Sequence, residues 1–118
     1  MKAAEATHCA GDQGKYWEMH DRLFASQAGL ARPDLSKHAQ ALGLNATAFD
    51  ECVDSGKSAA RIRKDIAEAA TVHATGTPTF FMGLTDATGA QIRGTRLIGA
   101  QPYQAFKEAI DHLLSPQE

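Results

Sequence analysis

The chain has 118 residues, with 12 Lys plus Arg against 14 Asp plus Glu, a formal net charge of −2. This length and a hydrophobic content of 43% predict one ordinary globular domain. Without a basic excess, nucleic acid is excluded as a main partner. No run approaches the roughly 18 apolar residues of a membrane-spanning helix, so no membrane partner is expected.

The N-terminal stretch predicts no export signal. It carries Lys2 and Glu5 and lacks an apolar core, so it does not have the pattern of a secretory leader. The chain as written is therefore expected in the cytoplasm; the alternative is that its leader is absent from this sequence.

Helical spacing of apolar residues predicts five helices before residue 75. Gly11 ends the first and Gly43 the third, which starts at Asp34 or Ser36. In the second helix the expected buried stripe is Tyr16, Met19, His20, Leu23 and Phe24.

The fourth and fifth helices have the clearest end signals and periodicity. Asn45 is expected to cap the fourth, and Gly56 to end it in the left-handed conformation. The fifth is predicted to bury a stripe at intervals of three and four: Ala59, Ile62, Ile66, Ala69, Ala70 and His73.

After Gly76 the pattern changes to that of a β-hairpin. Residues 77–83 form one predicted strand, 85–94 a long polar loop, and 95–99 the return strand. Pro102 opens a last helix. Because a lone hairpin is a marginal sheet with two free edges, we expect a second copy to supply a neighbour, giving a homodimer through the sheet edge.

Histidines and cations give weaker signals. No compact His pair lies on one helix, so neither a metal nor a cofactor is expected. His20 and His73 are predicted to be packed core histidines. A local basic cluster is interpreted as a solvated helix face; it comprises Lys57, Arg61, Arg63 and Lys64.

Several motifs together resemble the DsbA-like thiol-disulfide oxidoreductases, which have a thioredoxin fold with a helical insertion. The segments 75–81 and 96–103 are similar to the C-terminal end of that family, and 3–24 and 49–57 to its insertion. The resemblance implies an incomplete α/β fold, mostly α by content. It is a single domain, 1–118, with the insertion in 1–75 and the turn, two strands and helix in 76–118.

The sequence lacks the family's Cys-X-X-Cys motif, because its two cysteines, Cys9 and Cys52, are 43 positions apart. The strands that flank that motif in the family also have no counterpart here. The chain is therefore expected to be truncated relative to the family, whose members are periplasmic or in the cell envelope.

The resemblance also assigns roles to four residues. Thr77 and Pro78 match the cis-proline turn that contacts a substrate peptide; the alternative is a purely structural turn. Cys9 and Cys52 match a second, non-catalytic disulfide of the insertion; the alternative is two buried free cysteines. No catalytic residue is predicted, since neither cysteine has the surroundings of an activated thiolate.

Three functions follow as hypotheses. One is an oxidoreductase relative without redox activity of its own, whose partner would be a peptide or protein thiol. Another is a non-catalytic peptide-binding or dimeric assembly module that uses a strand edge or the proline groove. The third is an enzyme with Cys9 and Cys52 as its redox pair. Whether the chain is an enzyme stays open at this point.

Overall fold

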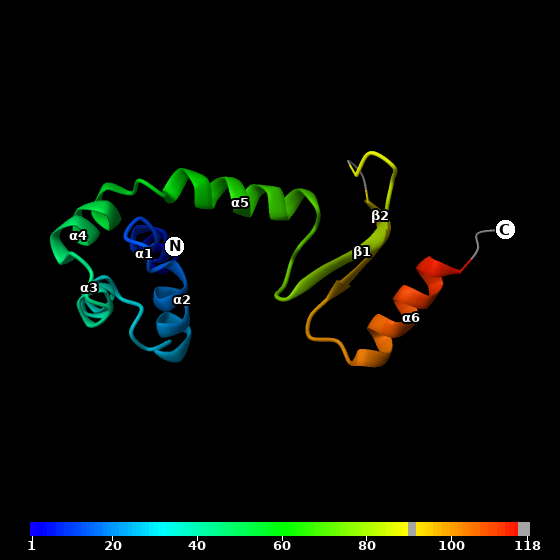
Figure 1. Cartoon of the computed structure of the whole chain (residues 1–118), viewed down its shortest axis with the longest axis horizontal. Helices are drawn as coiled ribbons and strands as arrows, with labels where there is room; N and C mark the ends of the chain where they lie inside the picture. The colour runs from blue at the N-terminus through cyan, green and yellow to red at the C-terminus, as the bar shows by residue number, and fades with distance from the viewer. Residues whose placement is uncertain (90–91, 116–118) are drawn as a thin grey trace. The chain divides into compact units, whose positions relative to one another are not determined.

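A computed structural model describes residues 1–89 and 92–115 (Figure 1). The predicted order of five helices, a hairpin and a last helix is confirmed. The elements are α1 Lys2–Gly11, α2 Tyr16–Ala25, α3 Arg32–Ala41, α4 Ala46–Ser55, α5 Ala59–Thr71, β1 Thr79–Thr85, β2 Ile92–Ile98 and α6 Tyr103–Leu114.

The chain forms two compact units. Unit one is Met1–Ala67 and unit two is Glu68–Glu118, so the division falls inside α5. The sequence placed its internal boundary after residue 75. The assignment of 1–118 to a single domain stays a prediction.

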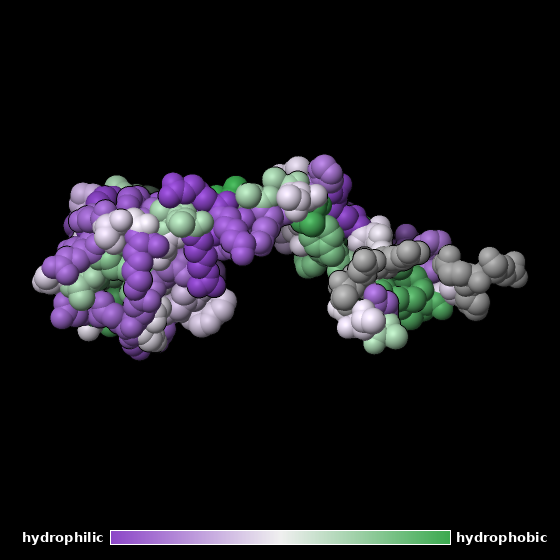
Figure 2. Space-filling view, turned by 90° about the horizontal axis from the view of Figure 1, so that it is seen from above, coloured by the Kyte–Doolittle hydropathy of each residue, from purple (hydrophilic) through white to green (hydrophobic). Residues whose placement is uncertain are grey.

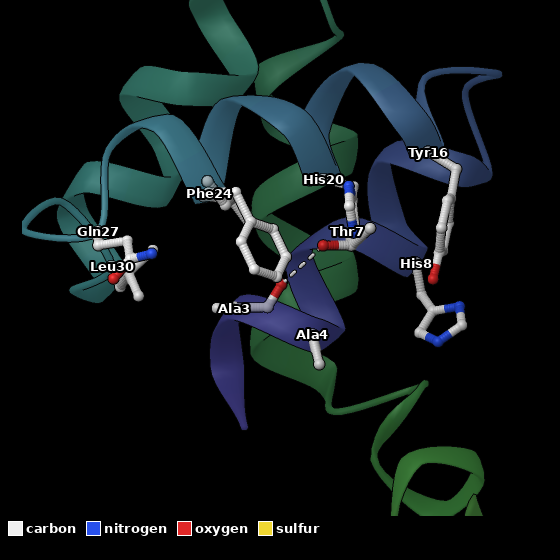
Figure 3. Close-up of a pocket in the computed structure, with 10 residues that line it drawn as sticks. Ala3, Ala4, Thr7, His8, Tyr16, His20, Phe24, Gln27 and Leu30 are labelled. Carbon is white, nitrogen blue, oxygen red and sulfur yellow. Dashed lines mark hydrogen bonds between the residues drawn. The ribbon is translucent and has the colours of Figure 1, made fainter. Parts of the chain in front are cut away.

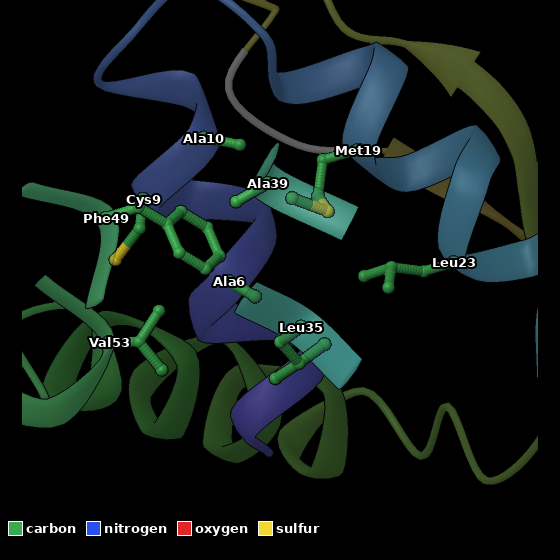
Figure 4. Packing of buried hydrophobic residues seen from close by; sticks show 9 residues of the cluster. All are labelled: Ala6, Cys9, Ala10, Met19, Leu23, Leu35, Ala39, Phe49 and Val53. Atoms are coloured by element: carbon green, nitrogen blue, oxygen red, sulfur yellow. The ribbon is translucent and has the colours of Figure 1, made fainter. Parts of the chain in front are cut away.

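Unit one is a helical unit with α1 at its centre, and its core is a cluster of buried apolar side chains (Figure 4). The central helix contacts α2, α3 and α4 because small residues on it let the neighbouring helices approach. Phe49 and Met19 are the largest fully buried side chains. The buried cluster is Ala6, Cys9, Ala10, Met19, Leu23, Leu35, Ala39, Phe49 and Val53.

The helix ends in unit one test the capping predictions. The side chain of Asn45 accepts a hydrogen bond from the Ala48 amide at 3.0 Å, and Gly56 has a φ of 67°, so both predictions for α4 are confirmed. The predicted start of α3 was too late. The helix begins at Arg32 because the fixed φ of Pro33 suits a first helical turn.

Unit two contains the two-stranded antiparallel sheet. β1 and β2 pair along seven positions, from Thr79 opposite Ile98 to Thr85 opposite Ile92. The prediction of a long loop over 85–94 was wrong, because pairing continues through Gly83 opposite Gly94. A Cβ at Gly94 would collide with the carbonyl oxygen of Met82, so the missing side chain lets the strands close there.

The last helix packs on the hairpin. The Phe106 ring of α6 lies edge-to-face on Phe80 of β1, with ring centroids 4.9 Å apart. Even so, among the described side chains of unit two none is buried. Green apolar side chains show at its surface in Figure 2, where the visible face of unit one is mostly purple. The exposed large ones are Val72, Phe80, Phe81, Leu84, Ile98, Tyr103, Ile110 and Leu114.

The predicted stripe of α5 is only half correct. Ala59 and Ile62 are buried in unit one, but Ile66 is 59% exposed. His73 is exposed and lies beyond the helix with a φ of 54°, so its prediction as a core histidine was wrong. The spacing marked an apolar face correctly, but only the start of that face is covered by the core of unit one, and Ile66, still within that unit, is not.

Candidate functional site

The turn between α5 and β1 holds the two residues that the sequence singled out for substrate contact. The Thr77–Pro78 peptide bond is cis, and both residues are exposed. On one side the Thr79 hydroxyl donates to the Gly76 carbonyl at 2.5 Å. On the other, the Gly99 amide donates to the Pro78 carbonyl at 2.7 Å, which fastens the turn to the end of β2.

Arg96 holds the chain that enters this turn. Its Nη1 donates to the carbonyl oxygens of Val72 and His73, at 3.0 and 2.9 Å. These carbonyls follow the end of α5, where backbone acceptors lack helical partners. A cation from β2 therefore fixes the loop that leads into the turn, a contact that the sequence reading did not foresee.

The two cysteines lie in unit one and are joined to each other. Cys9 on α1 and Cys52 on α4 form a disulfide, with Cα atoms 5.9 Å apart. The bridge expected from the family resemblance is therefore present, and the alternative of two free cysteines is wrong. Both cysteines of the sequence are used in it.

A single ion pair lies beside the exposed side of the bridge. Lys57 Nζ is 2.8 Å from Asp12 Oδ2, and that oxygen lies 3.8 Å from Cys52 Sγ. Of the predicted basic cluster, Lys57 thus has a specific carboxylate partner. No local pattern signals this ion pair, because the two residues are 45 positions apart.

A pocket of about 450 Å³ opens between α1 and α2 within unit one (Figure 3). Small residues of α1 form its floor, and rings from α2 form one wall. It has the volume and apolar character of a small-ligand or side-chain site. Its lining residues are Ala3, Ala4, Thr7, His8, Tyr16, His20, Leu23, Phe24, Gln27 and Leu30.

A row of ring contacts runs beside this pocket. His8 meets Tyr16, Trp17 meets both Tyr16 and His20, and His20 meets Phe24, with ring centroids 4.7–5.4 Å apart. The sequence predicted this side of α2 as buried. Phe24 is instead 66% exposed, and His20 lies at the pocket, hydrogen-bonded to Asp21 Oδ1 at 3.0 Å.

The buried histidine of unit one is His38, which the sequence did not distinguish from the other four. Its Nδ1 accepts from Arg22 Nε at 3.0 Å, and its Nε2 lies 3.0 Å from the Gly29 carbonyl. Because a carbonyl only accepts, Nε2 carries the proton and the ring is neutral. Both ring nitrogens are used in holding the α2–α3 loop, so His38 is structural.

Arg32 forms the main charged cluster of unit one, joining α3 to α4. It binds Asp50 and Asp54, and its Nη1 donates to Ser36 at 2.6 Å. Hydrogen bonds from Arg32 lower the pKa of Asp54, and the carboxylates raise the pKa of Arg32, with Asp54 as the larger cause. All groups are paired, so the cluster fastens two helices and holds no poised acid or base.

The described ranges hold neither a metal-ligand cluster nor a membrane-spanning helix. Within 1–89 and 92–115, no group of three or more His, Cys, Asp or Glu side chains could hold a metal ion. No helix in those ranges is both long and apolar enough to cross a bilayer.

Comparison with known proteins decides the family. Residues 1–111 match the DSBA-like thioredoxin domain. The chain belongs to this family. The relation to thiol-disulfide oxidoreductases that its motifs suggested is therefore established, and so is the DSBA-like fold, with its helical insertion and small antiparallel sheet.

The similar curated proteins are all much longer than this chain. It is 39% identical to the Na(+)/H(+) antiporter NhaA 1 of Salinispora arenicola over 92% of its own length and 15% of the relative's. It is 42% identical to NhaA 3 of Salinispora tropica over 68% of its own length and 12% of the relative's. It is 36% identical to NhaA of Herminiimonas arsenicoxydans over 79% of its own length and 14% of the relative's. No solved structure matches.

Proposed function

We propose that this DSBA-like chain has no dithiol redox turnover of its own and serves as a peptide-binding part of a thiol-disulfide oxidoreductase system. One observation carries the proposal: both cysteines are consumed in the Cys9–Cys52 bridge, and Cys9 is 1% exposed. Thiol-disulfide exchange needs an accessible thiolate, which in this arrangement must come from outside these 118 residues.

The surface around the turn supports the binding half of the proposal. Thr77 and Pro78 are exposed, and Phe81 on the adjoining strand is 50% exposed. An extended peptide can hydrogen-bond to a strand edge while apolar side chains beside it hold its own side chains. An extended polypeptide with apolar side chains is therefore the substrate class that this surface fits.

The redox half is tested by reduction of insulin disulfides in the presence of dithiothreitol. The expected rate equals that of dithiothreitol alone. Catalysis that disappears in both Cys9→Ser and Cys52→Ser would overturn the proposal and would make the bridge a redox pair.

The binding half is tested separately, by fluorescence anisotropy with labelled, reduced insulin B chain as the probe. Phe81→Ser is expected to weaken binding severalfold, because it removes apolar contact area at the strand. Ile66→Ser, which removes a 59% exposed apolar side chain of unit one outside the pocket, is the control and should bind as the parent does. Equal affinity of all three proteins would place the peptide elsewhere.

A second candidate is an assembly module that forms a homodimer through the sheet edge. In the described residues the sheet has two strands, so each strand has one edge without a hydrogen-bonded neighbour. Apolar side chains of the same hairpin are also exposed. Sedimentation velocity at several concentrations tests it. A monomer at all concentrations would leave peptide binding as the better candidate.

Ion transport is not part of the proposal. The antiporter relatives carry that activity in their names, but the matched segments are only 12–15% of their lengths. In these relatives the segment similar to this chain is part of a longer protein that is named as a transporter. We expect a peptide-binding DSBA-like segment to act as one part of such a longer protein.

A further inference from the structure

The two sulfurs of the bridge lie in different surroundings. Cys9 is 1% exposed and belongs to the apolar core around α1. Cys52 lies at the margin of that core, half-buried on α4, where it faces Asp12. An incoming thiol therefore meets the bridge from the side of Cys52.

Thiol-disulfide exchange depends on which sulfur a thiolate can reach. Attack on Cys9 would require the incoming molecule to displace side chains of the packed cluster that contains Phe49 and Val53. Attack on Cys52 requires no such displacement. The asymmetry of burial thus selects one of the two sulfurs.

We propose that Cys52 is a thiol-modification site, at which a low-molecular-weight thiol forms a mixed disulfide. The thiolate sulfur bonds to Cys52 Sγ, the Cys9–Cys52 bond breaks, and its electron pair leaves with Cys9, which then takes a proton from water. The incoming thiol is oxidised and Cys9 is reduced, so no further oxidant is needed. This step goes beyond the proposed function, since it makes the insertion disulfide a reversible link between α1 and α4.

The neighbouring ion pair adjusts this reaction. The Asp12 carboxylate, 3.8 Å from Cys52 Sγ, repels an anionic thiolate, and Lys57 at 2.8 Å from the same carboxylate offsets that charge. Removal of Lys57 should therefore slow the attack at low ionic strength. Lys37, paired with Asp34 on α3, has an equivalent ion pair and is the matched control.

Cys9 also determines how the modification ends. Once released, its thiol remains in the core next to the mixed disulfide, and its attack on Cys52 would expel the small thiol and restore the bridge. The modified state should therefore accumulate only while the external thiol is in excess.

The test uses glutathione as the probe. The folded protein is incubated with reduced glutathione, quenched with acid, alkylated with iodoacetamide and digested, so that Cys9 and Cys52 are read on separate peptides. We expect the product with glutathione on the Cys52 peptide and the alkyl group on the Cys9 peptide. This product should be at least tenfold more abundant than the product with the two groups exchanged. Glutathione on both peptides equally, or no adduct at all, would overturn the proposal.

Two sets of variants sharpen this test. With oxidised glutathione, Cys9→Ala, which leaves Cys52 free, should react at least tenfold faster than Cys52→Ala, which leaves Cys9 free. The difference should vanish in denaturant, which shows that folding and not sequence context causes it; similar rates in the folded state would contradict the proposal. Lys57→Gln should slow adduct formation in the parent protein, while Lys37→Gln should not.

Discussion

The guanidinium of Arg32 binds the carboxylate of Asp54 through two parallel hydrogen bonds, Nε to Oδ1 at 2.7 Å and Nη2 to Oδ2 at 3.0 Å. This fork geometry is specific to Arg, because a Lys ammonium cannot make two such contacts in one plane. The pair joins the first turn of α3 to the last turn of α4. It thereby fixes the orientation of the helix that carries Cys52.

We expect Arg32→Lys and Arg32→Gln to lower the Tm of unit one, with a pH dependence. Because the pKa of Asp54 is lowered in the folded state, chiefly by hydrogen bonds from Arg32, its stabilisation is present above the ordinary Asp range and is lost as the pH falls through the lowered value. The Tm difference from the parent should therefore be constant from pH 7 to about pH 4 and shrink below it. A difference that grew in acid would contradict the assigned pair.

Phenylalanine burial gives a matched pair of stability predictions. Phe49 is 0% exposed and Phe24 is 66% exposed, so only the first fills core volume. Phe49→Ala should lower the free energy of unfolding by about 3–5 kcal/mol, and Phe24→Ala by less than about 1 kcal/mol. Urea titration followed by Trp17 fluorescence measures both. Equal losses would show that the pocket wall at Phe24 is packed in solution.

Two glycines of the hairpin are required for different reasons, one for its backbone conformation and the other for the close approach of the two strands. Gly89 has a φ of 68° with nothing near its Cβ position, so Gly89→Ala should cost only the left-handed strain of about 1–2 kcal/mol. Gly94→Ala should do more damage, because a methyl group there collides with the Met82 backbone. Amide protection in β1 and β2, measured by hydrogen exchange, should fall more in Gly94→Ala than in Gly89→Ala.

Reduction of the disulfide should destabilise unit one without unfolding it at once. The bridge closes a loop with a sequence separation of 43. The chain-entropy estimate for such a loop is about 4 kcal/mol, an upper value. Excess reductant should therefore move the urea midpoint of Trp17 fluorescence to lower concentration. An unchanged midpoint, with two thiols detected by alkylation, would show that core packing alone holds α1 and α4 together.

Local signals predicted most of unit one. The Asn45 cap, the Gly56 end of α4 and the order of helices depend on residues within one or two turns of each other, and all are observed. The contacts that the sequence reading missed join distant positions: Arg32 with Asp54, Arg22 with His38, and Lys57 with Asp12. Side-chain pairs of this kind depend on how helices cross, which local propensity does not specify.

The sequence by itself determined the helix–hairpin–helix order, because that order follows from end signals and spacing. Its motifs also carried the resemblance to the DsbA-like family, which implied the Cys9–Cys52 bridge and left two free cysteines as the alternative. Only the tertiary structure decided which apolar residues are covered. Ile62 and Ile66 share one face of α5, yet Ile62 is 8% and Ile66 is 59% exposed. The physical reason is that periodicity marks a face able to be buried, whereas burial itself requires a neighbouring surface, which unit one supplies at Ile62 and not at Ile66.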